Sequence, residues 1–253
     1  SERTMKARMM QTIITIIYRV VCVFTHTMLF QNKDDQQWFI DKKIIKASKT
    51  VCVRGSGIDT KDWSMKRQYP TKKVTFILMA RLLVTKGIRE YCEAAKIIHD
   101  RYGQHAVCRL LGDEDTGNPG GINSAYLAPY ITANAIEFLG WRDDIKAQLA
   151  AADVFVLPSY REGLSRSGIE ATSMGMPIIT TNAVGCRELV DDQMNGILIE
   201  PQSVNELVEA MEQLINNPDQ IRSMGEASRK KAVNEFDVQY VIDAYIKLYE
   251  KIN

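Results

Sequence analysis

Residues 152–181 read ADVFVLPSYREGLSRSGIEATSMGMPIITT. The short apolar run 152–159, closed by Pro158, is typical of a buried parallel strand. A loop with Gly163 follows, and residues 165–175 carry a helix pattern from a serine cap at Ser165 to a terminating Gly175. A second apolar run, 176–181, indicates the next strand, so the stretch predicts a strand, a helix and a strand in succession.

Two glutamates flank the loop of this unit. Glu162 falls at the carboxyl end of the first strand, and Glu170 falls one to two turns into the helix. Both can face a ligand at the helix N-terminus, where free N–H groups and the helix dipole favour an anion such as phosphate.

The same alternation of strand and helix extends over most of the chain. Strands are predicted at residues 74–81, 105–112, 134–140, 153–159, 176–181 and 196–200. Helices are predicted at 86–102, 143–152 and 165–175, and three more close the chain at 203–217, 218–236 and 237–252. This pattern predicts an α/β fold with a doubly wound parallel sheet and helices on both faces, in which ligands bind beyond the carboxyl ends of the strands.

Positive charge follows the strand at 74–81. Arg81 comes directly after its apolar run, and Lys86 begins the next helix with Gly87 behind it. A guanidinium offers a rigid fork for phosphate oxygens and an ammonium offers a mobile point charge, so together they suit a diphosphate.

Composition narrows the classes of function. The 253-residue chain has a net charge of +1, which gives no reason to expect nucleic acid as a partner. Five scattered cysteines without a C-x-x-C pair favour reduced thiols in a cytosolic protein. Residues 1–60 hold ten lysines and arginines against five acidic residues, so this end suits an anionic membrane or substrate.

The most apolar segment is Thr12 to Phe30. Arg19 within it makes a membrane-spanning helix costly, so we expect a packed or membrane-surface helix that leads into a buried strand. The chain begins without methionine and shows no signal peptide, which suggests a piece of a longer protein.

Three stretches carry a family resemblance: MARLLVTKG (79–87), GWRDDIKAQLAAADVFVLPSYREGLSRSGIEATSMGMPIITTNAVGCRELV (140–190) and NGILIEP (195–201). They resemble the donor-binding half of glycosyltransferase family 4, the retaining, sugar-nucleotide-dependent enzymes of the GT-B fold. The upstream stretches FQNKDDQQWFI (30–40) and VRGSGIDT (53–60) resemble that family's link between its two halves. The combination looks most similar to bacterial members that extend lipid-diphosphate-linked oligosaccharides for capsule or O-antigen.

The resemblance implies roles for particular residues. Arg81 and Lys86 match the pair that holds the donor diphosphate, and Glu162 matches the glutamate that binds hydroxyls of the donor sugar. Glu170 matches the glutamate that accepts hydrogen bonds from the ribose. The remaining donor-binding positions that it implies are Gly163, Leu164, Ser165, Trp141, Arg142 and Gly112.

Two positions depart from the family pattern. Ser165 stands where a proline is common, and Gly168 stands where a larger apolar residue is usual. These departures affect the expected shape of the sugar pocket.

The resemblance also implies domains, partners and location. Residues 1–60 correspond to a remnant of the acceptor-binding domain with its linker, 61–235 to the donor-binding Rossmann-like second domain, and 236–253 to a C-terminal helix. The implied reaction moves a sugar from a nucleotide sugar, a UDP-hexose or UDP-N-acetylhexosamine, to a lipid-linked saccharide at the cytoplasmic face of the plasma membrane. It needs no metal or other cofactor, and membrane contact would be peripheral. Two alternatives are a nucleotide-sugar-binding module that is inactive as this fragment and a GT-B sugar-nucleotide epimerase.

Several other polar residues have competing interpretations. Asp113 and Asp115 have a spacing that metal-dependent sugar transferases use, but their place after a strand favours a turn or a loop beside the donor. Asp143 and Asp144 are expected to cap the next helix. The histidines His26, His99 and His105 show no ligand spacing, and Gly185 suits either a close backbone approach or a plain tight turn.

Overall fold

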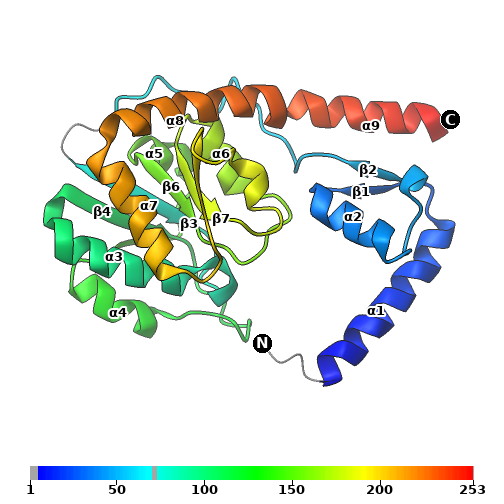
Figure 1. The fold of residues 1–253 in the computed structure, drawn as a ribbon, viewed down its shortest axis with the longest axis horizontal. Coiled ribbons are helices and arrows are strands. Elements are labelled where there is room, and N and C mark those ends of the chain that lie inside the picture. The colour runs from blue at the N-terminus through cyan, green and yellow to red at the C-terminus, as the bar shows by residue number, and fades with distance from the viewer. Residues whose placement is uncertain (1–4, 70–72, 253) are drawn as a thin grey trace. The chain divides into compact units, whose positions relative to one another are not determined.

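The computed structural model describes residues 5–69 and 73–252 (Figure 1). Contacts between backbone positions divide the chain into two compact units, Ser1–Arg54 and Gly55–Asn253.

The larger unit is built on a six-stranded parallel sheet, which confirms the predicted fold class. Its strands are β3 (Val74–Met79), β4 (Ala106–Leu111), β5 (Glu137–Gly140), β6 (Val154–Leu157), β7 (Ile178–Thr181) and β8 (Gly196–Ile199). The order across the sheet is β5-β4-β3-β6-β7-β8, so the topology switches direction between β3 and β6. Phe76 pairs with Val154 and Ile77 with Phe155 at this switch. All six strands predicted between residues 74 and 200 are present, with shorter bounds.

The central strands are apolar on both faces because helices cover both sides of the sheet. Every residue of β3 and β6 is buried. Successive side chains of a strand point to opposite faces, so Phe76 and Leu78 enter one hydrophobic cluster and Ile77 and Met79 enter the other. This explains why both strands read as continuous apolar runs.

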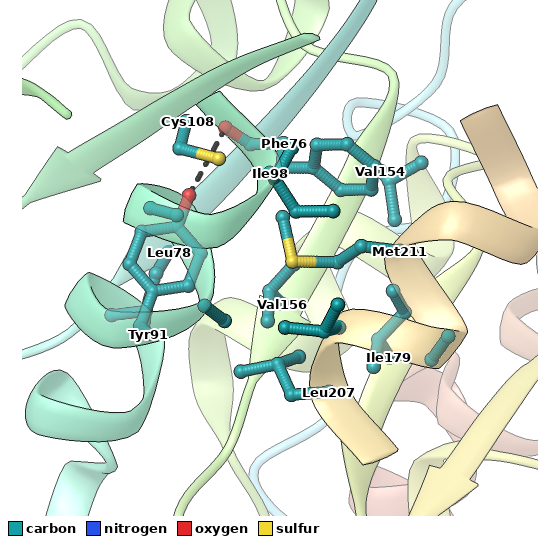
Figure 2. Packing of buried hydrophobic residues seen from close by; sticks show 14 of the residues in the cluster. Phe76, Leu78, Tyr91, Ile98, Cys108, Val154, Val156, Ile179, Leu207 and Met211 are labelled. Carbon is teal, nitrogen blue, oxygen red and sulfur yellow. Dashed lines mark hydrogen bonds between the residues drawn. The ribbon is translucent and has the colours of Figure 1, made fainter. Parts of the chain in front are cut away.

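One cluster lies between the sheet and the helices α3 (Ile88–Tyr102) and α7 (Val204–Asn216). Figure 2 shows Tyr91 of α3 on the side of Leu78 and Cys108, and Met211 of α7 on the side of Val154 and Val156, all within this cluster. The Tyr91 hydroxyl donates to the Phe76 carbonyl at 3.3 Å, which satisfies a polar group in this apolar setting. Burial raises the pKa of Tyr91 well above its ordinary value.

The opposite face packs against α5 (Ile145–Ala150) and α6 (Arg166–Ser173). Ser165 is the N-cap of α6, because its side chain accepts from the Gly168 N–H, and Gly175 follows the helix at a φ of 71°. The predicted helix at 165–175 is therefore confirmed with its cap and its terminating glycine.

Three further helices complete the larger unit: α4 (Ser124–Thr132), α8 (Pro218–Lys231) and α9 (Val238–Ile252). A five-residue π-helical turn, Ala232–Phe236, joins α8 to α9. The three helices predicted at the end of the chain correspond to α7, α8 and α9, whereas α4 was not predicted.

The smaller unit contains α1 (Met5–Phe24), β1 (Met28–Phe30), α2 (Lys33–Asp41) and β2 (Thr50–Cys52). Its two strands pair in parallel, and Cys22, Phe30, Ile44 and Ile45 form a small core. The predicted succession of an apolar helix and a strand is present, but the strand is not buried as expected: Phe30 is the one buried residue of β1, and most of the described side chains of α1 are exposed. No helix within the described ranges is both long enough and apolar enough to cross a membrane.

Candidate functional site

A cavity of about 390 Å³ opens at the carboxyl ends of the strands, beside the β3–β6 switch. Nine of the ten residues that the sequence singles out line it: Arg81, Lys86, Gly112, Trp141, Arg142, Glu162, Leu164, Ser165 and Glu170. Gly163 lies between two of them in the chain and is not among the lining residues. All of these residues belong to the larger unit.

Lys86 and Glu162 form an ion pair at the wall of this cavity. Lys86 Nζ lies 2.6 Å from Glu162 Oε1, and their side chains are only 22% and 11% exposed. Lys86 ends a 3-10 turn before α3, and Glu162 follows β6. The topology thus brings together two charges from residues far apart in the chain.

Arg81 supplies a second cation with a different setting. Its side chain is 66% exposed and pairs with Asp115 at 3.0 Å. An exposed pair of this kind is weak, so Arg81 is free to exchange Asp115 for another anion.

Asp113 and Asp115 lie in the loop that follows β4. Asp113 lines the cavity, and Asp115 pairs with Arg81. Among the residues that the structure describes, no three histidine, cysteine or acidic side chains cluster as a metal site would require.

The start of α6 closes one side of the cavity. The Ile169 N–H makes the first intrahelical bond to the Ser165 carbonyl at 3.0 Å, so the N–H groups of Arg166 and Ser167 precede the hydrogen-bonded part of the helix. Both residues line the cavity. This arrangement is suited to a bound anion, because the helix dipole adds to the N–H groups.

Glu170 lies one turn further along α6. Its side chain is 12% exposed, and its Oε1 accepts from Arg166 Nε at 2.8 Å. Arg166 also donates to the Gly57 carbonyl at 3.0 Å and to Ser56 Oγ at 3.3 Å. Sequence reasoning missed Arg166, although its spacing of four residues from Glu170 is a helical ion-pair signal.

Two glycines allow the backbone to approach the cavity closely. Gly185 has a φ of 77°, and a Cβ there would collide with the Glu162 carbonyl. Of the two alternatives for Gly185, the structure shows the close backbone approach, and the Glu162 N–H donates to the Val184 carbonyl at 2.9 Å. At Gly112 a Cβ would collide with the Ala80 carbonyl.

Trp141 and Arg142 follow β5 at the open side of the cavity. The exposed Trp141 donates from Nε1 to Asp143 at 3.2 Å, and Arg142 Nε donates to Asp144 Oδ1 at 3.2 Å. The capping role expected of Asp143 and Asp144 is wrong in its detail: Asp144 holds the N-cap position of α5 but makes no side-chain cap bond. Its oxygens accept from Arg142 and Gln148 instead, and the Gln148 hydrogen bond with the Arg142 charge lowers its pKa.

A thiol lies behind the Lys86–Glu162 pair. Burial raises the pKa of Cys186 to about 11, and the Glu162 charge acts in the same direction. Its Sγ donates to the Ser159 carbonyl at 3.6 Å. A thiol that stays protonated at neutral pH is a poor nucleophile, so the reactive groups of the cavity are its cations and carboxylates.

Comparison with known proteins gives a consistent result. Residues 71–217 match the family model described as glycosyl transferases group 1. A Campylobacter jejuni relative, N,N'-diacetylbacillosaminyl-diphospho-undecaprenol alpha-1,3-N-acetylgalactosaminyltransferase, is 26% identical over 99% of this chain and 67% of its own length. An Escherichia coli relative, UDP-Gal:alpha-D-GlcNAc-diphosphoundecaprenol alpha-1,3-galactosyltransferase, is 33% identical over 69% of this chain and 44% of its own length.

Solved structures share the fold. The Anabaena protein HepE in complex with UDP superposes with a TM-score of 0.81 at 20% identity, over 94% of this chain and 68% of that one. The isolated C-terminal domain of the Francisella tularensis group 1 protein LpcC has a TM-score of 0.61 at 21% identity, over 72% of this chain and 99% of that domain.

Proposed function

We infer the function from membership of a family: the chain belongs to the group 1 glycosyl transferases, whose model matches more than half of it. We propose that its cavity binds a nucleotide sugar and that the protein transfers the sugar with retention of configuration. The observation that carries the proposal is the meeting of Lys86, Glu162, Arg81 and the α6 N-terminus in one cavity beside the topological switch. Ligands of open α/β sheets bind at such a switch.

The charges of the cavity suit a departing nucleoside diphosphate. Negative charge grows on the phosphate as the glycosidic bond breaks, and preorganised cations and N–H groups stabilise it. Arg81 and Lys86 supply the cations, and Arg166 and Ser167 supply first-turn N–H groups. The loss of one such group costs on the order of 3 kcal/mol in the barrier, which is about a hundredfold in rate.

Glu162 is assigned to the donor sugar. Its carboxylate accepts hydrogen bonds from sugar hydroxyls once Lys86 turns to the diphosphate. A retaining hydrolase sets two carboxyl groups about 5 Å apart across the scissile bond. Here Glu170 pairs with Arg166 and is assigned to the ribose instead, so Glu162 is a binding group and no covalent nucleophile is assigned.

The relatives' names support the proposed donor and acceptor. The Escherichia coli relative is named for UDP-galactose, and both relatives are named for diphosphoundecaprenol acceptors. We therefore assign a UDP-hexose or UDP-N-acetylhexosamine donor, a lipid-linked saccharide acceptor and a place at the cytoplasmic face of the membrane. The cations of the chain itself neutralise the diphosphate, so the transfer is assigned no metal.

Calorimetric titration of the chain with UDP, GDP and ADP tests the donor site. We expect UDP to bind, and the double variant Arg81→Ala/Lys86→Ala to lose that binding. The matched control is Lys96→Ala/Arg101→Ala, which removes two cations from α3 that do not line the cavity. Unchanged UDP binding by the Arg81/Lys86 variant would contradict the assigned diphosphate site.

A binding module without turnover is the second candidate. It is favoured by the location of the whole cavity in the larger unit and by the chain's coverage of only 44% to 67% of these relatives' lengths. Sugar transfer by the isolated 253-residue chain would exclude this candidate. Nucleotide binding without transfer would favour it.

A further inference from the structure

Arg166 lines the cavity but has no side-chain role in the proposed transfer chemistry. We propose that Arg166 is a positioning residue: it holds the Glu170 carboxylate for the ribose hydroxyls and thereby makes the site select nucleotides that carry them. This inference rests on the proposed donor site. It adds a residue that acts on the ribose-binding role assigned to Glu170.

The first observation is the environment of the Glu170 carboxylate. Its side chain is 12% exposed, and Arg166 Nε holds Oε1 at 2.8 Å. Within the part of the chain that the structure describes, Oε2 makes no further hydrogen bond. A carboxylate that is nearly buried and held by one oxygen presents the other as an acceptor, and a ribose hydroxyl is a donor that fits it.

The guanidinium is itself held in place from its other side. One terminal nitrogen donates to the Gly57 carbonyl at 3.0 Å and to Ser56 Oγ at 3.3 Å. Because Nε and this nitrogen both bind protein acceptors, the fork joins Glu170 to the Gly55–Gly57 segment. A guanidinium with these hydrogen bonds links two protein elements and is poorly placed to bind a phosphate instead.

The acceptors on the Gly55–Gly57 segment are fixed by glycine geometry. Gly55 and Gly57 have φ values of 60° and 66°, and a Cβ on Gly57 would meet the Val238 backbone at 2.7 Å. The next residue, Ile58, donates from its N–H to the Phe236 carbonyl at 2.9 Å, and its carbonyl accepts from the Val238 N–H at 2.8 Å. The Arg166 guanidinium therefore binds a backbone segment that is hydrogen-bonded to the start of α9.

The consequence is a selectivity that resides in one contact. A site built to accept hydrogen bonds from a ligand hydroxyl rejects an analogue without it, because its polar group is left unpaired. Arg166 would raise this selectivity by reducing the number of positions that Glu170 adopts. Loss of Arg166 should then weaken the binding of nucleotides with ribose hydroxyls and leave the binding of nucleotides without them unchanged.

The experiment titrates the full chain with UDP and with 2',3'-dideoxy-UDP, for the unchanged protein and for Arg166→Gln, Glu170→Gln and the double variant. We expect Arg166→Gln to weaken UDP about tenfold, an effect of the size of one charge-assisted hydrogen bond. Dideoxy-UDP should change less than about twofold. Arg166→Lys should restore part of the UDP affinity, because it keeps the charge without the fork.

The double variant separates an action through Glu170 from a direct contact. If Arg166 acts through Glu170, replacing Arg166 in the Glu170→Gln protein lowers the affinity for UDP by less than a further factor of about two. The matched control is Lys96→Gln, which removes the cation of another ion pair with a spacing of four residues, Lys96–Asp100 on α3, and should leave both affinities unchanged.

Several outcomes would overturn the inference while leaving the donor site intact. They are equal binding of UDP and dideoxy-UDP by the unchanged chain, an equal loss of both ligands in Arg166→Gln, and additive losses in the double variant. If the unchanged chain binds none of UDP, GDP and ADP, the donor site itself is wrong and the inference fails with it.

Discussion

Lys86 and Glu162 neutralise each other in the cavity, with Nζ and Oε1 2.6 Å apart. Breaking a poorly exposed pair leaves an uncompensated charge, so it occurs only when a new partner replaces the old one. In the proposed donor complex the diphosphate takes Lys86 and the sugar hydroxyls take Glu162. Donor binding at this pair is therefore an exchange of partners, which favours ligands that carry both groups.

Cys186, behind this pair, gives a prediction at the scale of one residue. Burial raises its pKa from 9.0 to about 11, so at pH 9 the folded chain keeps the thiol proton that half of the unfolded chains have lost. We expect iodoacetamide to label Cys186 at pH 9 about tenfold or more slowly in the folded chain than in urea, since the thiolate is the reactive form. Mass spectrometry of the labelled peptides measures both rates.

The same shift has a consequence for stability. Because the folded-state pKa lies above the unfolded-state value, the contribution of the neutral thiol is fully present below about pH 9 and is lost as the pH rises toward 11.

The partly exposed Cys52 serves as an internal reference for reagent activity in the labelling experiment. Equal labelling of Cys186 in the folded and unfolded chains would show that its thiol is not protected as the structure indicates.

The turn between β3 and α3 shows how one glycine positions a functional element. Gly87 has a φ of 70°, and a Cβ there would collide with the Pro158 carbonyl at the end of β6. The residue thus joins Lys86 to α3 while the backbone passes close to the neighbouring strand end. This close approach fixes the position of Lys86 relative to Glu162.

Replacing this glycine gives a prediction at the scale of elements. We expect Gly87→Ala to lower the free energy of unfolding by about 2 kcal/mol or more, because a left-handed conformation and a backbone collision add together. Urea unfolding followed by circular dichroism measures the change. The control is Gly140→Ala, which has a φ of 64° but no atom within 4 Å of its Cβ, and should lose less. A smaller loss for Gly87→Ala than for Gly140→Ala would contradict this account.

Two elements show where local pattern reasoning stops. The helix α4 contains Pro129 and only one buried residue, Leu127, so its sequence lacks the amphipathic period that identified α3. At α5 both Asp143 and Asp144 were expected to cap the helix; Asp144 holds the N-cap position, but the capping bond is absent. The neighbouring Arg142 and Gln148 take the carboxylate instead, and their competition depends on side-chain positions that a cap pattern does not contain.

The division into two units gives a prediction at the scale of the whole molecule. Every residue that lines the cavity lies in Gly55–Asn253. We expect a chain of residues 55–253 to fold and to bind UDP within about twofold of the 253-residue protein, because it keeps all of these contacts. Circular dichroism and calorimetric titration of both chains test this, and a tenfold loss with intact folding would show that residues 1–54 take part in the site. The solved LpcC domain shows that the related fold forms alone.

The sequence by itself determined the succession of the sheet strands and several of the residues that line the cavity. Largely apolar runs marked β3 to β8, and Arg81, Lys86, Glu162 and Glu170 were identified by their places after strands or within a helix. These features are local, since burial on both faces of a parallel strand demands an unbroken apolar run. A one-dimensional pattern is enough to carry them.

Only the tertiary structure decided which of these residues meet. The contacts of Lys86 with Glu162, of Arg81 with Asp115 and of Arg166 with Gly57 join positions 34 to 109 residues apart. The neighbouring positions of β3 and β6 in the sheet bring the first of these pairs together, and the left-handed glycines of the Gly55–Gly57 segment bring the last. Such contacts depend on packing between distant segments, and no local spacing in the chain specifies that packing.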